Sequence, residues 1–179
     1  MSKKGTYAVR ISGVGEGMHH FSFELDQQFF ASFGNSDLKY GKIAAGVILE
    51  KTLSYMALHF DFEGEVELVC DRCLDPYMAA IRQHQTVFVK YGDIPGELED
   101  DVIMIRKEDH EIEVGQLMYE YIVLSLPVQR IHPDDENGRS GCDPDMLEKL
   151  KALTAKELNL ENQADPRWDA LKGIIEKNN

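Results

Sequence analysis

Cys70 and Cys73, with two residues between them, form the sharpest local feature of this sequence. The turn between two cysteines at this spacing brings both sulfur atoms to one side, where both can bind the same metal ion. A structural zinc site needs four Cys or His ligands, and this motif supplies two of them. The sequence offers His132 and Cys142, both in a later polar segment, as the remaining ligands. Together the four residues are a candidate Cys₃His zinc site.

Two other interpretations of these thiols remain open. The cysteines can stay reduced and simply pack in the core or lie at the surface. A C-x-x-C motif is also typical of thiol–disulfide chemistry, but there it belongs to a βαβ pattern, whereas here it follows a strand predicted to belong to a hairpin. Arg72 would lower the thiolate pKa, while Asp71 and Asp75 oppose that effect. Redox chemistry therefore ranks behind the other two interpretations.

Motifs for other catalytic chemistry are missing from the sequence. The glycines at 13, 15 and 17 are not followed by the Gly-Lys-Ser/Thr of a phosphate-binding loop, and they indicate a flexible turn. The sequence contains neither H-E-x-x-H nor G-x-S-x-G. Its six histidines show no partner pattern that would define an active site. We therefore expect no catalytic residues, no small-molecule substrate and no enzymatic activity.

The charge balance is strongly acidic. The chain carries 32 acidic and 19 basic residues, which gives a formal net charge of -13. This balance argues against sequence-independent binding to nucleic acid, which depends on many Lys and Arg contacts to phosphate. It fits a basic protein partner, although excess acid also simply keeps a protein soluble. The acidic segment 97–101 is one candidate contact for such a partner, or else a solvated loop.

Two arginines are candidate partner-binding residues. Arg72, between the cysteines, can reach a phosphate or a carboxylate, and its alternative is a surface ion pair with a neighbouring aspartate. Arg167 lies beside Trp168 and can stack on a base. A lone tryptophan on an amphipathic helix more often anchors that helix to the core. Arg167 and Trp168 are therefore open to two interpretations, partner binding and core packing.

The compartment is predicted to be the cytoplasm. An odd, small number of cysteines, three in 179 residues, does not indicate a secreted disulfide framework. The sequence has no run of about 18 apolar residues, and the two lysines near its start are not followed by the apolar region of a secretory signal. We therefore expect no membrane contact.

Alternating apolar residues dominate the first 110 positions and predict strands there. Glu63-Gly64 is predicted to be a two-residue hairpin turn, because glycine accepts positive φ. A short helix or turn is expected at 26–33 with Asp26 as its cap, and 92–101 is predicted to be an acidic loop. The predicted strands cover 6–11, 18–25, 42–62, 65–70, 78–91 and 102–106.

Helical patterns follow in the last third of the chain. Apolar residues at helical spacing predict helices at 113–125, 144–153 and 166–177. The segment 129–145 is polar and rich in Gly, Pro and Asp, which is typical of a long surface loop that can be mobile. We therefore predict one α+β domain over residues 1–179, with an antiparallel-rich sheet in the N-terminal two-thirds and helices concentrated in the C-terminal third.

Three segments, taken together, resemble the YceD family, the large ribosomal RNA subunit accumulation proteins. The first is 66–76 (VELVCDRCLDP), the second is 120–132 (EYIVLSLPVQRIH) and the third is 165–171 (DPRWDAL). The resemblance covers about residues 64–175. The cysteine-rich branch of the family has further cysteines after the Leu-Pro of the second segment. Here only His132 and Cys142 stand in that region.

The resemblance implies a bacterial, non-enzymatic factor for ribosome biogenesis. Such a factor promotes the processing or accumulation of large-subunit (23S) ribosomal RNA, as an adaptor to RNA or to a basic large-subunit ribosomal protein. In many bacteria the family's gene lies beside that of a small basic ribosomal protein, and the charge of -13 fits a partner of opposite sign. The alternatives are a thiol–disulfide or metal-dependent protein centred on Cys70 and Cys73, and a zinc-stabilised interaction module.

Overall fold

The computed structural model describes residues 7–34, 38, 40–92, 96–99 and 101–153. The chain divides into two compact units, Met1–Cys142 and Asp143–Asn179, which are treated separately. Within the second unit, helix α3 spans Pro144–Leu153, as the sequence predicts. The predicted helix at 166–177 lies outside the described residues. The single domain over residues 1–179 stays a prediction, because compactness does not measure whether two units unfold together.

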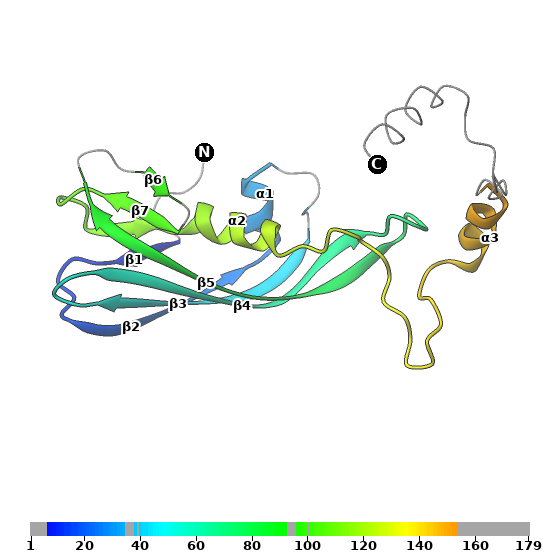
Figure 1. The fold of residues 1–179 in the computed structure, drawn as a ribbon, viewed down its shortest axis with the longest axis horizontal. Helices are drawn as coiled ribbons and strands as arrows, with labels where there is room; N and C mark the ends of the chain where they lie inside the picture. The colour runs from blue at the N-terminus through cyan, green and yellow to red at the C-terminus, as the bar shows by residue number, and fades with distance from the viewer. Residues whose placement is uncertain (1–6, 35–37, 39, 93–95, 100, 154–179) are drawn as a thin grey trace, which may run out of the picture. The chain divides into compact units, whose positions relative to one another are not determined.

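A six-stranded sheet forms the body of the first unit (Figure 1). Its spatial order is β2-β3-β4-β5-β7-β6, and every neighbouring pair is antiparallel except β5 and β7. A separate two-stranded sheet pairs β1 (Ala8–Arg10) with β8 (Glu111–Glu113). The α+β class is therefore confirmed. The strands of the large sheet are β2 (Gly17–Leu25), β3 (Gly41–Lys51), β4 (Met56–Val69), β5 (Pro76–Tyr91), β6 (Gly96–Glu99) and β7 (Val102–Ile105).

The long hairpin of β4 and β5 is the main feature of the sheet, and its turn is not where the sequence indicated. The prediction of a turn at Glu63-Gly64 is wrong, because both residues lie inside β4 and pair with Arg82 and Ile81 of β5. A Cβ atom on Gly64 would lie 2.7 Å from the Cα of Ile43. The glycine therefore permits a close approach of two backbones inside the sheet.

The chain turns at the two ends of β4 instead. Before β4, the Thr52 N–H donates to the Tyr55 carbonyl over 2.9 Å and closes the turn from β3. After β4, the chain turns at residues 70–75 and enters β5. The 14-residue β4 and the 16-residue β5 therefore run the full distance between two turns. These two ends carry the features that bear on function.

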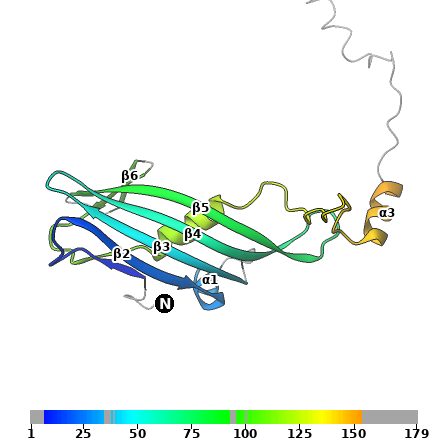
Figure 2. The same cartoon turned by 90° about the horizontal axis from the view of Figure 1, so that it is seen from below.

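One face of the large sheet carries the core. Along β4, alternate side chains such as Leu58, Phe60 and Phe62 are buried, because successive residues of a strand point to opposite faces. Helices α1 (Gln27–Ser32) and α2 (Gly115–Leu124) cover this face (Figures 1 and 2). Helix α1 is capped as predicted, since the Asp26 carboxylate accepts hydrogen bonds from the N–H groups of Gln28 and Phe29. Helix α2 buries Leu117, Met118, Tyr119 and Ile122.

Two further predictions need correction. The predicted strand over 42–62 is in fact two strands, because the turn at 52–55 separates β3 from β4. The segment 92–101 is not purely a loop, because it contains β6, which pairs with β7. Strand β8 was not predicted, since three residues are too few to show a period. Among the described residues, no helix has the length and apolar character that crossing a membrane requires.

Candidate metal centre

The turn between β4 and β5 sets the positions of Cys70 and Cys73. The Cys70 N–H donates to the Asp75 carbonyl over 2.9 Å, and the Leu74 N–H donates to the Cys70 carbonyl over 2.9 Å. Leu74 has a φ of 67°, a conformation that bulky residues rarely adopt. The Arg72 N–H points at the Cys70 Sγ atom over 3.4 Å. This tight turn places both thiols in the interior, with exposed fractions of 0% and 3%.

A reciprocal pair of hydrogen bonds joins this turn to the segment that follows α2. The Asp71 N–H donates to the Arg130 carbonyl over 2.7 Å. In return, the Arg130 N–H donates to the Asp71 carboxylate over 2.9 Å. Sequence reasoning missed this role of Asp71, which it considered only as a charge near the thiols. The pair places His132, two residues beyond Arg130, next to the cysteine turn.

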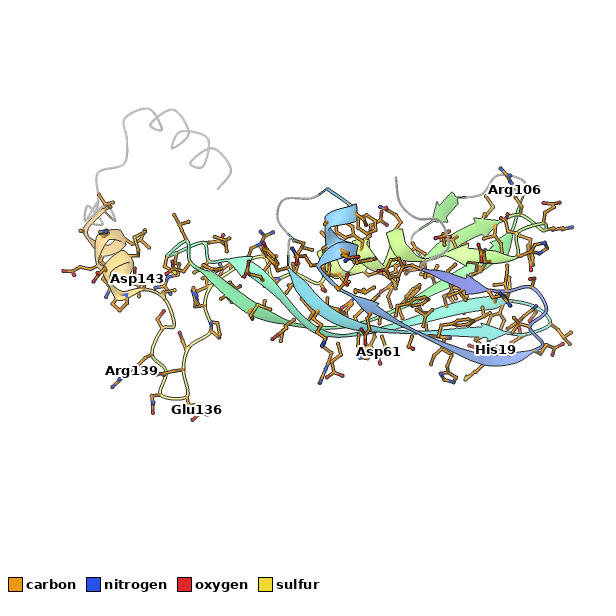
Figure 3. The ribbon with its side chains drawn as sticks, turned by 180° about the vertical axis from the view of Figure 1, so that it is seen from behind. His19, Asp61, Arg106, Glu136, Arg139 and Asp143 are labelled. Atoms are coloured by element: carbon orange, nitrogen blue, oxygen red, sulfur yellow. The ribbon has the colours of Figure 1, made fainter. Side chains whose placement is uncertain are left out.

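A hairpin-like loop then brings Cys142 back to His132. The Asp135 N–H donates to the Arg139 carbonyl over 2.8 Å, and Gly138 turns the chain with a φ of 74°. A Cβ atom on Gly141 would lie 2.7 Å from the Pro133 carbonyl oxygen, so the two sides of the loop touch at its base. Figure 3 shows Arg139 at the far tip, pointing away from the chain.

The structure brings all four predicted ligands together. Their ligand atoms lie within 4.8 Å of one another. The Sγ atoms of Cys70 and Cys142 are 3.7 Å apart, and the Cys73 Sγ lies 3.3 Å from the His132 Nδ1. A tetrahedral zinc site with Zn–S bonds of about 2.3 Å has sulfur–sulfur edges of about 3.8 Å. These four residues, called the cysteine centre below, therefore have the types and the spacing of a structural zinc site; that they bind metal stays a prediction.

The electrostatics of the cysteine centre favour a thiolate. Burial raises the pKa of the Cys70 thiol, but hydrogen bonds from the N–H groups of Cys73 and Arg72, together with those from His132, lower that pKa to about 6. Burial and the adjacent Cys70 raise the pKa of Tyr77, whose ring packs 5.0 Å from the His132 ring. Because a metal binds the thiolate and not the thiol, this environment suits a metal ligand.

The two arginines predicted to bind a partner have different outcomes. Arg72 is exposed, on the outside of the turn that carries the cysteines. Arg167 lies outside the described residues. Leu74, next to Cys73, is 67% exposed and adds an apolar side chain beside Arg72. The outer surface of the cysteine turn therefore offers one cation and one apolar contact.

The fold and the cysteine centre define a class of protein, an α+β sheet protein with a buried Cys₃His cluster at one end of its longest hairpin. Residues 58–174 match the family model of YceD, described as the large ribosomal RNA subunit accumulation protein. Since this match covers well over half of the 179 residues, the chain belongs to the YceD family. No curated protein and no solved structure matches the chain.

Proposed function

We propose that the chain is a non-enzymatic factor that promotes the processing or accumulation of large-subunit (23S) ribosomal RNA. The observation that carries this proposal is the family match over residues 58–174, since the family is described by accumulation of the large ribosomal RNA subunit. The match includes every residue of the cysteine centre. It also includes Arg72, which the turn exposes. The family match and the cysteine centre therefore fall in the same part of the chain.

The cysteine centre supports an adaptor role with zinc as a structural cofactor. Bound zinc would join the turn at 70–75 to the loop that ends at Cys142, two segments far apart in the chain. Joining them would fix the outer surface of the turn, with Arg72 and Leu74 exposed on it. A guanidinium group can pair with RNA phosphate or with a carboxylate, and the net charge of -13 favours a basic ribosomal protein as a further partner.

The burial of the thiols supports a structural role over a catalytic one. The exposed fractions of Cys70, Cys73 and Cys142 are 0%, 3% and 4%. Thiol–disulfide exchange needs an accessible thiolate that can attack a sulfur of the substrate. Structural zinc sites have all four positions filled by protein ligands, which fits a cluster that is closed to substrates.

A thiol–disulfide protein is the second candidate, because the Cys70 and Cys142 sulfurs are only 3.7 Å apart and the pKa of Cys70 is lowered to about 6. The alkylation rate of the protein purified without chelators, measured against pH, separates the two functions. A redox protein should react rapidly at neutral pH. A structural centre should react slowly until it is unfolded, because the thiols are covered.

The main test is deletion of the gene in its own cell, with measurement of the ratio of large-subunit to small-subunit ribosomal RNA. We expect the ratio to fall and the wild-type gene to restore it. Arg72→Glu should restore it poorly, whereas Arg139→Glu is the matched control, an identical charge change at the tip of the loop. An unchanged ratio on deletion would contradict the proposed function.

Metal analysis tests the cofactor separately. Protein purified without chelators should contain about one zinc ion per chain, because structural sites stay essentially saturated. The Cys70→Ser variant should contain much less. A zinc content below roughly 0.3 per wild-type chain would rule out a tight structural site.

A further inference from the structure

The end of the sheet opposite the cysteine centre is hollowed and aromatic. A hollow of about 840 Å³ lies at the turn between β3 and β4 and extends along the last residues of β5. Tyr55, Phe88 and Tyr91 line it, and their side chains are 43%, 46% and 50% exposed. Single exposed apolar side chains are common on protein surfaces, but several gathered in one patch mark an interaction site or a ligand groove. Three of them in one hollow, called the aromatic hollow below, indicate a ligand.

The rings of the aromatic hollow are held in place by their surroundings. The Tyr55 hydroxyl donates a hydrogen bond of 2.6 Å to the Glu50 carboxylate. The Tyr55 and Phe88 rings are 6.3 Å apart and nearly perpendicular, at 67°. Phe88 lies on β5, whose register is fixed by β4 on one side and by β7 on the other. The Tyr55 and Phe88 rings are therefore held in a fixed arrangement, which lowers the entropy that binding would cost.

Cationic side chains flank these rings. Lys90 lies on β5 between Phe88 and Tyr91 and lines the same hollow. A second hollow, of about 370 Å³, lies on the other side of Tyr91 and is lined by Arg106 and Lys107. Figure 3 shows the Arg106 side chain projecting at this end of the molecule. Glu16 and Glu108 also contribute to the two hollows, so the area is mixed in charge and not strongly basic.

We propose that the aromatic hollow binds unpaired nucleotides of single-stranded RNA. A base would stack on the ring of Phe88 or Tyr91, and the adjoining phosphates would lie beside Lys90, Arg106 and Lys107. This inference rests on the proposed function, for which it names the RNA-binding surface. Proteins that bind single strands combine stacking aromatic rings with a local groove of positive charge, and here Lys90, Arg106 and Lys107 would supply that groove on a body whose net charge is -13.

The chemistry of the hollow favours RNA over an apolar peptide. An apolar side chain from a protein would fill the aromatic surface but would leave an excess of positive charge, since Lys90, Arg106 and Lys107 outnumber Glu16 and Glu108 in the two hollows. A nucleotide can contact both the aromatic rings and the cations, because each base has a π face and each linkage carries a negative phosphate. Lys51 is not counted among the phosphate contacts, since its Nζ donates to the carbonyls of Ile11 and Val14.

Binding of labelled 12-mer oligouridine and oligoadenine to the full chain, followed by fluorescence anisotropy, tests the proposal. Phe88→Ala and Tyr91→Ala should each weaken binding roughly fivefold or more. Met78→Ala is the matched control, because Met78 lies on the same strand as Phe88 and is 47% exposed. It should leave the affinity unchanged. The thermal unfolding midpoint of each variant shows that it is folded.

The salt dependence gives a second, independent measurement. Three phosphate contacts on a single strand predict a slope of about -2 for log K against log salt concentration. Lys107→Ala should reduce the slope to about -1.4, since one contact is lost. A flat salt dependence, or aromatic variants that bind as tightly as the wild type, would overturn the proposal. Crosslinking of Tyr91 to a ribosomal protein, without any oligonucleotide binding, would also overturn it and assign the hollow to a protein.

Failure of this inference is distinguishable from failure of the proposed function. If the Tyr91→Ala variant binds oligonucleotides normally while gene deletion still lowers large-subunit RNA, the aromatic hollow is rejected and the function stands. If deletion leaves the ratio of the RNAs unchanged while Tyr91→Ala loses oligonucleotide binding, the function is rejected and the hollow stands.

Discussion

The two ends of the β4–β5 hairpin differ in which side chains they bury and which they expose. At one end the cysteine centre buries three thiols and half-buries His132. At the other end the aromatic hollow leaves Phe88 and Tyr91 half exposed on a fully paired part of the sheet. The 14 residues of β4 separate these ends by roughly 45 Å. A buried cluster indicates a structural task, whereas exposed rings on a rigid support indicate a binding task.

The difference also lies in what stabilises each end. Near the aromatic hollow, Met56, Val87 and Val89 are buried and β7 adds a further strand. The turn at 70–75 lies beyond the stretch of β4 that pairs with β3, which stops at Val66. It is joined to the loop mainly through the hydrogen bonds of Asp71 and the cysteine centre itself. We therefore expect the cysteine end to depend on metal and the aromatic end to be stable without it.

Metal removal should have the largest effect and should be confined to one end. In hydrogen-exchange measurements, a chelator should speed exchange of the amides at 70–75 and 130–142 roughly a hundredfold or more, because metal binding energy stabilises the local fold. The amides at 56–60 should be unchanged. The Cys142→Ser variant should behave like the metal-free wild type with or without chelator. Equal loss of protection at both ends would remove the contrast between them.

A substitution in the middle of β4 should have the next largest effect. In Gly64→Ala, the new Cβ would lie 2.7 Å from the Ile43 Cα, and a backbone cannot move away as a flexible side chain can. We expect the free energy of unfolding to fall by about 2 kcal/mol or more, measured by urea denaturation.

Gly46→Ala is the matched control for this strand interior. Gly46 lies in the neighbouring strand β3, and a Cβ there would meet the Asp61 carbonyl oxygen at 3.8 Å and the Asp61 Cβ at 3.9 Å, both ordinary contacts. Its effect should stay within about 0.5 kcal/mol. If the two variants are equally stable, the close approach at Gly64 carries no energetic cost. Loss of zinc in the Gly64→Ala variant would show that the cysteine centre depends on the backbone geometry in the middle of β4.

Most of the fold could be predicted from the sequence, except where one residue type occurs in two different kinds of local structure. Alternation revealed strands over the region of β2 to β5, although it joined β3 and the first part of β4 into one strand at 42–62, and helical spacing revealed α2, because burial on one face imposes a period. The pair Glu63-Gly64 was misleading, since glycine serves both tight turns and close backbone contacts. Only the partner strand decides between these, and Lys42 and Ile43 lie some 20 residues earlier in the chain. A local sequence pattern does not show which strands pair with each other.

The four residues of the candidate site could be predicted from the sequence, but their arrangement in space could not. The spacing between His132 and Cys142 is too long for a standard zinc motif, yet the loop between them folds back on itself. The signals for that fold were present in Asp135 and Gly138, which form the turn. The aromatic hollow was not predicted, because Tyr55 and Phe88 are far apart in sequence and meet only through the register of β4 and β5.

Exchanging the ring of Phe88 sharpens the assignment of the aromatic hollow. Phe88→Leu keeps most of the apolar area but removes the π face, whereas Phe88→Trp enlarges it. If bases stack there, the leucine variant should bind oligonucleotides several-fold more weakly, and the tryptophan variant should bind at least as tightly as the wild type. Anisotropy titrations measure both. Equal affinities for the two variants would mean that apolar area, and not stacking, is what the hollow provides.

The smallest expected effect concerns the hydrogen bond that holds Tyr55. Hydrogen bonds from Tyr55 and then from His59 hold the pKa of Glu50 below its ordinary value of 4.5. Tyr55→Phe removes the first of these, so the pKa of Glu50 should rise toward 4.5, as NMR titration can measure. A carboxyl with a lowered pKa stabilises the fold above its ordinary pKa, and this contribution is lost as the pH falls through the folded-state value. The variant should therefore be slightly less stable at pH 7 and equal to the wild type in acid.

The Tyr55→Phe variant also separates the effect of the ring on RNA binding from the effect of the hydrogen bond that orients the ring. The aromatic face of residue 55 remains in Tyr55→Phe, so RNA affinity should change less than twofold if the ring itself makes the contact. His59→Gln is the matched control, because it removes the 3.0 Å contact of His59 with Glu50 and leaves the Tyr55 hydroxyl bond in place. A large loss of affinity in Tyr55→Phe alone would mean that the fixed orientation of the ring, and not only its presence, determines binding at the open end of the sheet.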